Sequence, residues 1–323
     1  MADSFLSPGI DPPSPTLSAR LRELAAFLAA PGAGRLTEEQ RALALGIARR
    51  LVADAAVRID PALDADAMWH NWLTEGLPGA DRLAPLCFAR AEEHRWREQS
   101  AQRAAVAPLV AGTDDVAEDP ATVADTAMSA IDRAYLTLRI ADRRRFDALG
   151  NPCLAPADLG GDVWRALLLD VAAWRLVAAA RDPALAARLG EAVRAELARH
   201  ADAAGIDRAA AAYHELLDAA GALPETAATA IARHDWPTLV GLAAAASHRS
   251  YGEMALALLT AEAAALPSLL APLRIERSAL APLEASLAML ADRAVAAGGT
   301  AADDYAALLQ ARADALSSPG DGG

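Results

Sequence analysis

The sequence predicts an all-α protein of packed helical hairpins, arranged as a bundle or as an irregular, HEAT-like α-solenoid. Alanine, the strongest intrinsic helix former, makes up roughly a quarter of the 323 residues. Aromatic residues make up only 4%, and no stretch alternates the β-branched and aromatic residues that strands favour. Gly or Pro separates many short apolar stretches, which suits short helices held by packing. We therefore expect no significant β-sheet.

The first third of the chain predicts a helical domain. Residues 1–15 are rich in proline and predict a disordered lead-in, and residues 16–111 predict the N-terminal domain. Thr37 and Gln40 fit a capping box, in which each side chain satisfies a backbone N–H at the start of a helix. Pro61 predicts the start of the next helix.

A longer helix with a charged second half, AEEHRWREQSAQR, is predicted over residues 80–104. His94 and Glu98 lie one turn apart on its polar side, which we expect to be solvated. The acidic stretch AGTDDVAEDPAT follows without any arginine. Residues 112–121 therefore predict an acidic linker between two domains.

Residues 122–317 predict the C-terminal helical domain, and residues 318–323 a disordered tail. A helix from residue 123 to residue 147 ends in the arginine-rich ADRRRFDALGNP. Residues 161–180 predict the buried central helix of this domain, because their few charges do not share a face. Further helical segments are predicted at residues 183–203, 206–220, 225–233, 237–248, 251–263, 277–296 and 300–316.

Composition excludes several classes of function. The chain has no lysine, so neither a lysine Schiff base nor a P-loop lysine is available. The net charge of −13 is spread along the chain and disfavours general nucleic-acid binding. We find no secretory signal and no apolar stretch long enough to cross a membrane, so the cytoplasm is the expected location. Cys87 and Cys153 lie too far apart in sequence for a metal knuckle.

Two histidines, His234 and His248, bracket an apolar run in RHDWPTLVGLAAAASHR. Asp235 is a preferred N-cap residue before Pro237, so the histidines are expected at the ends of two helices. A helix of about 12 residues spans about 18 Å, which separates the two rings too far for one metal ion. The interpretation as helix ends is therefore preferred to a metal or acid–base site.

Two further patterns could carry chemistry. His214 and Asp218 lie one turn apart in YHELLD, which differs from a zincin helix at its second ligand, and an ordinary hydrogen-bonded pair is preferred. The densest basic cluster, RIADRRRFD, could hold an anion or an acidic partner, or could be a solvated helix end. The candidate partner or anion surface consists of Arg143, Arg144, Arg145, His234, His248 and Arg249.

Four segments carry a family resemblance: TEEQRALALGIARRLVADAAVRI, ADRRRFDALGNPCLAPADLGGDVWRALLLDVAAWRL, LPETAATAIARHDWPTLVGLAAAASHRSYGEMALALL and LAPLRIERSALAPLEASLAML. Together they resemble a mainly alphaproteobacterial family known as domain of unknown function 2336. The resemblance implies a helical fold with HEAT-like character and bacterial origin. It implies no activity, so no functional residue is carried over.

We expect a non-enzymatic regulatory or scaffold protein that binds a protein partner, with no cofactor or catalytic residue assigned. Short packed helices naturally build surfaces for a partner helix or peptide. The alternative is a helical enzyme that uses His214 or His234 with nearby carboxylates, with or without a metal ion. That alternative predicts that these histidines line one cavity together with Asp or Glu.

Overall fold

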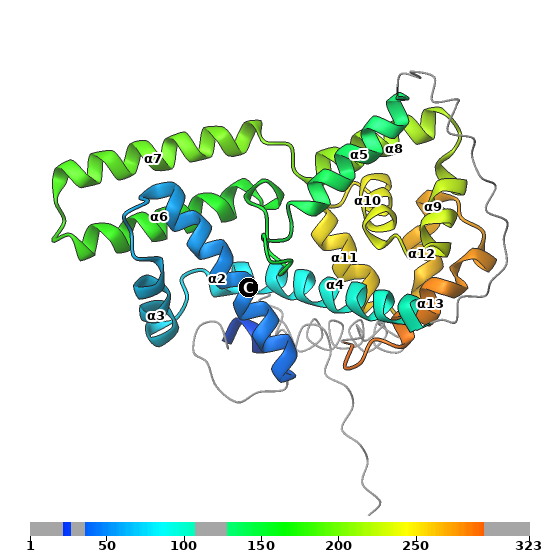
Figure 1. Ribbon diagram of the computed structural model, residues 1–323, viewed down its shortest axis with the longest axis horizontal. Helices are drawn as coiled ribbons and strands as arrows, with labels where there is room; N and C mark the ends of the chain where they lie inside the picture. Colours follow the sequence, from blue (N-terminus) through cyan, green and yellow to red (C-terminus); the bar gives the residue numbers. More distant parts are fainter. Residues whose placement is uncertain (1–21, 27–35, 107–127, 294–323) are drawn as a thin grey trace, which may run out of the picture.

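The computed structural model describes residues 22–26, 36–106 and 128–293, and within these ranges the chain is all-α (Figure 1). Apart from one isolated bridge between Phe146 and Pro152, the described residues form no β-structure, so the predicted fold class is confirmed. The helices are α2 (Glu38–Ile59), α3 (Ala65–Glu75), α4 (Ala80–Val106), α5 (Ala130–Arg143), α6 (Gly161–Ala178), α7 (Pro183–Asp202), α8 (Ile206–Ala219), α9 (Leu223–Ala232), α10 (Trp236–Ala246), α11 (Tyr251–Thr260), α12 (Leu266–Leu270) and α13 (Ala281–Ala288).

Local signals set the starts of the first helices. The side chain of Thr37 accepts a hydrogen bond from the backbone N–H of Gln40 at 3.2 Å, and the Gln40 side chain accepts one from the backbone N–H of Thr37 at 3.1 Å. The predicted capping box is therefore confirmed. The predicted helix start at Pro61 is wrong, because Asp64 caps α3 instead and accepts from the Ala67 N–H at 2.9 Å.

Helix α4 runs through both hydrophobic cores of the molecule. Its first half buries Leu83, Cys87 and Phe88 in a first core, formed with α2, α3, α6 and α7. Further along, Trp96 is fully buried in a second core, formed with α5 and α8 to α13. Its ring stacks on that of Trp236, with the centroids 4.4 Å apart. One long helix therefore joins the two cores.

The two cores divide the chain differently from the predicted domains. Helices α6 and α7 belong by sequence to the predicted domain at 122–317, but they pack on α2 in the first core through residues such as Trp164 and Leu189. The chain thus leaves the first core after α4 and returns to it at α6. Helix α2 packs against α6 and α7 as well as α3 and α4, so the first core needs segments from both sides of the connection.

Several predicted segments lie outside the described residues. These are the lead-in at 1–15, the linker at 112–121, the helix at 300–316 and the tail at 318–323. Residues 262–293 are described and are less regular than expected, since short helices replace the single helix predicted at 277–296. Within the described ranges, no helix combines the length and apolar character that crossing a membrane requires.

The helix buried on all sides is α10, not α6. Only one side of α6 is buried, and Leu169 and Val177 on it are 50% and 65% exposed. The prediction of a central buried helix at 161–180 is therefore wrong. Nine residues of α10 are buried, between α8, α9 and α11. Its sequence WPTLVGLAAAA has no charged residue, whereas α6 carries four.

The connection at residues 144–160 leads from α5 in the second core to α6 in the first. Helix α5 begins after its N-cap Ser129 and ends at Arg143, so it is shorter than the helix predicted up to residue 147. The connection contains one 3-10 turn, Pro156–Asp158, which packs against the start of α8. The polar side chains considered below gather around this connection.

Candidate functional site

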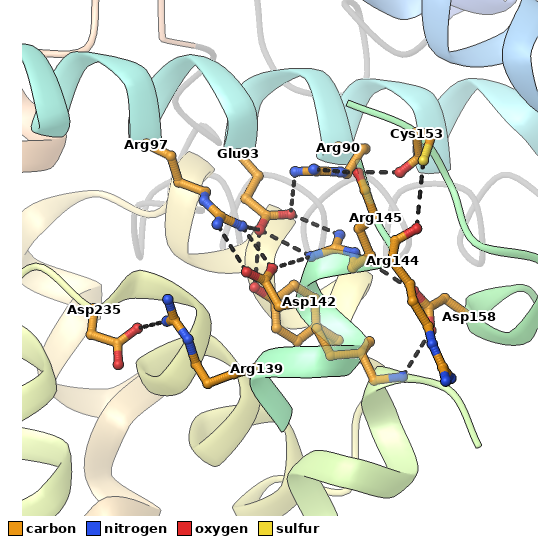
Figure 2. A network of polar contacts seen from close by, with 12 residues as sticks. Arg90, Glu93, Arg97, Arg139, Asp142, Arg144, Arg145, Cys153, Asp158 and Asp235 are labelled. Carbon is orange, nitrogen blue, oxygen red and sulfur yellow. Dashed lines mark hydrogen bonds and ion pairs between the residues drawn. The ribbon is translucent and has the colours of Figure 1, made fainter. Parts of the chain in front are cut away.

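The three consecutive arginines predicted to share one surface lie in three different environments. Arg143 is exposed on α5, and Arg144 is exposed and lines a cavity. Arg145 is only 4% exposed and enters an ionic network between the two cores (Figure 2). A surface role for Arg145 is therefore wrong. The side chains diverge because α5 ends at Arg143, and successive residues at a helix end point in different directions.

Glu93 of α4 is the centre of the buried network. Arg145 donates to both of its carboxylate oxygens, at 3.0 and 2.8 Å, and the Tyr251 hydroxyl donates at 2.9 Å. Arg90 lies 3.4 Å from the same carboxylate and donates to the backbone carbonyls of Arg145 and Cys153 at 2.8 and 3.2 Å. The four side chains are nearly inaccessible to solvent. They tie α4 and α11 to the connection between α5 and α6.

A second ion pair extends the network to α5. Arg97 donates to both carboxylate oxygens of Asp142, at 2.7 and 2.9 Å, and lies over the ring of Phe146, 4.9 Å from its centroid. Asp158 adds a carboxylate 3.6 Å from the Arg145 guanidinium. Three arginines thus face three acids, and such a balance of charge is what allows ions to be buried.

The arginines keep the central carboxylate ionised. Burial opposes ionisation of Glu93, but the guanidinium groups of Arg145, Arg90 and Arg97 outweigh burial and hold the pKa of Glu93 well below its usual range. Burial lowers the pKa of Arg90 to about 10, although Glu93 opposes this shift. Both groups therefore stay charged at neutral pH. An acid–base catalyst instead needs a pKa near the working pH, and the shifts of Glu93 and Arg90 do not provide one.

The side of α4 that carries His94 and Glu98 was expected to be solvated, and it is so only in part, since Glu98 is exposed but His94 is largely buried. The two side chains, one turn apart as expected, lie 3.5 Å from each other. The neighbouring charges are buried because partners distant in sequence neutralise them. The buried charged residues of this stretch are Arg90, Glu92, Glu93 and Arg95.

A cavity of about 530 Å³ lies next to the network, since Cys153 contributes to both. Helices α2, α6 and α7 and the connection between α5 and α6 form its walls. Its volume is within the range of small-molecule sites. Its apolar lining consists of Leu154, Ala155, Pro156, Ala157, Trp164 and Ala203.

Part of the charged lining of the cavity is paired internally. Arg58 donates to Asp54 at 2.8 Å and lies 3.6 Å from Glu196, which also pairs with Arg199. These four residues lie on the facing helices α2 and α7. The ion pairs connect the two helices at one side of the cavity.

Two arginines of the lining have no such partner. No carboxylate of the described residues lies within ion-pair distance of Arg50 or Arg144, although Arg50 donates to the Pro152 carbonyl at 2.9 Å. Asp147 also lines the cavity, but its carboxylate accepts hydrogen bonds from the side chain and backbone N–H of Asn151. The cavity therefore presents two guanidinium groups that no carboxylate of the described residues pairs with.

His234 and His248 lie at helix ends, as predicted. They follow α9 and α10 in the left-handed conformation, with φ of 55° and 53°. After α9, the Asp235 N–H donates to the Ala230 carbonyl at 2.8 Å and the His234 N–H to the Ile231 carbonyl at 3.1 Å. This is a Schellman motif, and the same pattern follows α10. Both histidines are exposed, as is Arg249, and their partner role stays a prediction.

We expect His248→Gly to stabilise the protein and His234→Gly to stabilise it less. A residue other than glycine in the left-handed conformation costs about 1 kcal/mol, which glycine avoids. His234 also stacks on Trp236, with ring centroids 5.0 Å apart, and loses this contact on substitution. Urea unfolding of both variants and the wild type measures the order of their stabilities. A His248→Gly variant less stable than the wild type contradicts this assignment.

Asp235 and Asp218 have partners other than those predicted. Asp235 is the N-cap residue of α10, but its side chain does not cap the backbone; it pairs with Arg139 at 2.8 Å (Figure 2). Asp218 pairs with Arg274 of another segment rather than with His214. In both cases the arginine comes from a distant part of the chain, which a local pattern does not reveal.

No metal or histidine centre emerges from the described part of the chain. Within it, no three His, Cys, Asp or Glu side chains are grouped closely enough to hold a metal ion. His214 and His234, which the enzyme alternative placed in one cavity, do not line the 530 Å³ cavity. The histidine that does line it is His200, whose ring nitrogen lies 3.1 Å from the Leu159 carbonyl.

The two free cysteines differ in accessibility. Cys87 is fully buried in the first core, and burial raises the pKa of its thiol to about 12. Cys153 is half-buried and lines the cavity, and burial raises its pKa as well. The thiolate is the reactive form, so both shifts slow alkylation, and the fully buried thiol is the slower of the two.

We therefore expect iodoacetamide to modify Cys153 but not Cys87 in the folded protein at pH 8. Cys87 reacts only after denaturation, because its thiol is inaccessible and stays protonated. Mass spectrometry of arginine-cleaved peptides measures both rates. Equal rates at the two cysteines in the folded protein contradict the burial of Cys87.

Sequence reasoning missed the residues that line the cavity, apart from Arg144. Arg50, Trp164 and His200 come from three different helices, and each has an ordinary helical neighbourhood. The available signal was weak: the Pro-containing NPCLAPAD connects two predicted helices, and binding residues often lie in such connections.

Comparisons of the chain with protein-family models, with curated proteins and with solved structures find no match. The resemblance to domain of unknown function 2336 therefore stays a prediction.

Proposed function

We propose that this chain is a non-enzymatic regulatory protein that binds an acidic amphipathic helix of a partner protein on the outer side of α5. The single observation that carries the proposal is the pair Leu136 and Ile140, which are 44% and 55% exposed on one side of a helix. We name the four residues Arg133, Leu136, Ile140 and Arg143 the α5 face.

The α5 face lies opposite the packed side of the helix. Ala134, Leu138 and Ala141 are buried, and α5 packs mainly on α8, at the outside of the bundle (Figure 1). At about 100° per residue, Leu136 and Ile140 lie near the centre of the opposite side. Apolar residues spaced by four match the anchors with which one helix binds another.

Charge supports an acidic partner. Arg133 and Arg143 stand one turn before and after the apolar pair, and neither forms an ion pair within the described part of the chain. Both arginines are exposed, so their guanidinium groups are accessible to acidic side chains of a partner. Complementary charges around an apolar centre speed association and select the partner.

Site-specific cross-linking tests the proposal. A photoreactive benzoylphenylalanine replaces the exposed Thr137, and cross-linked proteins in a native lysate are identified. Affinity for the purified partner is then measured by fluorescence anisotropy. We expect the variant Leu136→Asp/Ile140→Asp to bind at least about tenfold more weakly, because apolar anchors dominate such interfaces. Val177→Asp, at an exposed apolar residue on α6, serves as the control and retains affinity.

Charge reversal provides the second criterion. Arg133→Glu/Arg143→Glu weakens binding, and replacing acidic residues of the partner helix by arginine restores it. Unchanged affinity of the Leu136→Asp/Ile140→Asp variant contradicts the proposal. So does cross-linking that yields only nucleic acid, or no protein.

A further inference from the structure

We infer that the 530 Å³ cavity binds one organic monoanion, whose anionic head is held by Arg50 and Arg144 and whose apolar body lies against Leu154 and Pro156. This site is separate from the α5 face, and the two proposals share no residue.

The apolar part of the lining favours an organic ligand over an inorganic ion. Leu154, Pro156 and Trp164 line the cavity together with three alanines. Trp164 is fully buried, and its indole N–H has no hydrogen-bond partner within the described residues. An aliphatic or aromatic body that covers the partly exposed Ala155, Pro156 and Ala157 removes their apolar surface from water, which favours binding.

Arg50 and Arg144 indicate that the ligand carries an anionic group. Arg58 and Arg199 of the same cavity are already paired with carboxylates, whereas no carboxylate in the described ranges pairs with Arg50 or Arg144. Arg50 is partly buried, and burial lowers its pKa, although Asp147 opposes this shift. A guanidinium group donates parallel hydrogen bonds to both oxygens of a carboxylate, so a bound carboxylate supplies the missing counter-charge.

The charge of the lining favours a single negative charge on the ligand. Four arginines and three carboxylates leave one net positive charge, with histidine neutral. A dianion such as a phosphate monoester adds a second negative charge near Asp54, Asp147 and Glu196. Like charges at short range disfavour such a ligand.

Isothermal titration calorimetry with octanoate tests the inference on the full chain. We expect one octanoate per chain, and at least about tenfold weaker binding of acetate, which lacks the apolar body, and of octan-1-ol, which lacks the charge. Octyl phosphate binds more weakly than octanoate at pH 8, where it is a dianion. Bound octanoate also slows iodoacetamide modification of Cys153, which lines the cavity, but leaves Cys87 unmodified as before.

Variants locate the site. Arg144→Gln and Arg50→Gln are expected to weaken octanoate binding about tenfold each, because each removes a charged hydrogen-bond donor. Arg144 is exposed, so we expect its replacement to leave folding intact. Arg50 also donates a hydrogen bond to the Pro152 carbonyl, so its replacement removes a structural contact as well. Arg143→Gln is the matched control and leaves octanoate affinity unchanged.

Four outcomes overturn the inference. Octan-1-ol that binds as tightly as octanoate shows an apolar cavity without anion recognition. Acetate that binds as tightly shows an anion site without an apolar component. If octanoate shows no saturable binding at millimolar concentration, the cavity is not an octanoate site. If Arg144→Gln leaves octanoate affinity unchanged, the ligand does not bind at this cavity. Because Arg144 is not part of the α5 face, none of these results bears on the partner proposal.

Discussion

Glu93→Ala is expected to lower the free energy of unfolding by about 3–5 kcal/mol, because it removes the carboxylate that Arg90 and Arg145 share and leaves the buried network one negative charge short. Arg145 and Arg90 are 4% and 1% exposed and share the Glu93 carboxylate. Without that carboxylate, water cannot reach either guanidinium group unless the structure opens locally. Urea unfolding followed by circular dichroism measures the loss.

Two controls separate the buried charge from the other contacts of Glu93. Tyr251→Phe keeps the ring against which the Arg145 guanidinium packs at 4.4 Å and removes one donor to Glu93. It is expected to cost about 1.5–3 kcal/mol, the range for a hydrogen bond to a charged group. Asp66→Asn breaks the exposed pair with Arg49 and produces no measurable change. A Glu93→Ala variant as stable as Asp66→Asn contradicts the network.

The effect of Glu93→Ala also depends on pH. The pKa of Glu93 is depressed in the folded protein, so the stabilisation is present above the unfolded value of about 4.3 and is lost as pH falls below it. The stability difference between the wild type and Glu93→Ala therefore shrinks on acidification below about pH 4. Urea unfolding at pH 7 and pH 3 measures this, and an equal difference at both pH values contradicts the assignment.

Gly205→Ala is expected to destabilise the protein by about 3 kcal/mol, through overpacking of a rigid contact. A Cβ atom at Gly205 would stand 2.3 Å from the Ala157 carbonyl oxygen and 2.7 Å from an Asp158 carboxylate oxygen. The clash involves backbone, so α8 or the connection at 144–160 must move. Such movement also breaks the hydrogen bond from the Ile206 N–H to Asp158, at 2.7 Å.

A glycine with open surroundings provides the matched control. Gly190 lies within α7, where an added Cβ meets nothing within 4 Å. Gly190→Ala is expected to stabilise the protein by about 1 kcal/mol, because alanine is the better helix former. Differential scanning calorimetry compares both variants. A Gly205→Ala variant with the melting temperature of the wild type contradicts the close approach of α8 to the connection.

The sequence by itself determined the class of the fold and most helix ends. The capping box of Thr37 and Gln40 and the helix end at His234 were predictable because each depends on hydrogen bonds between residues three to five positions apart. The buried charges of α4 were not predictable by the same means. A run of charged residues on a helix has the same local pattern whether it faces water or a distant ion pair.

Only the tertiary structure decided which charges are buried and where a ligand can bind. Arg143, Arg144 and Arg145 are adjacent and identical in type, yet only Arg145 reaches Glu93, which lies 52 positions away in sequence. The cavity likewise needs α2, α6 and α7 side by side, because its lining comes from segments between Arg50 and Ala203. Helix formation depends on nearest neighbours along the chain. Ion pairing and cavity formation depend on which segments the cores bring together.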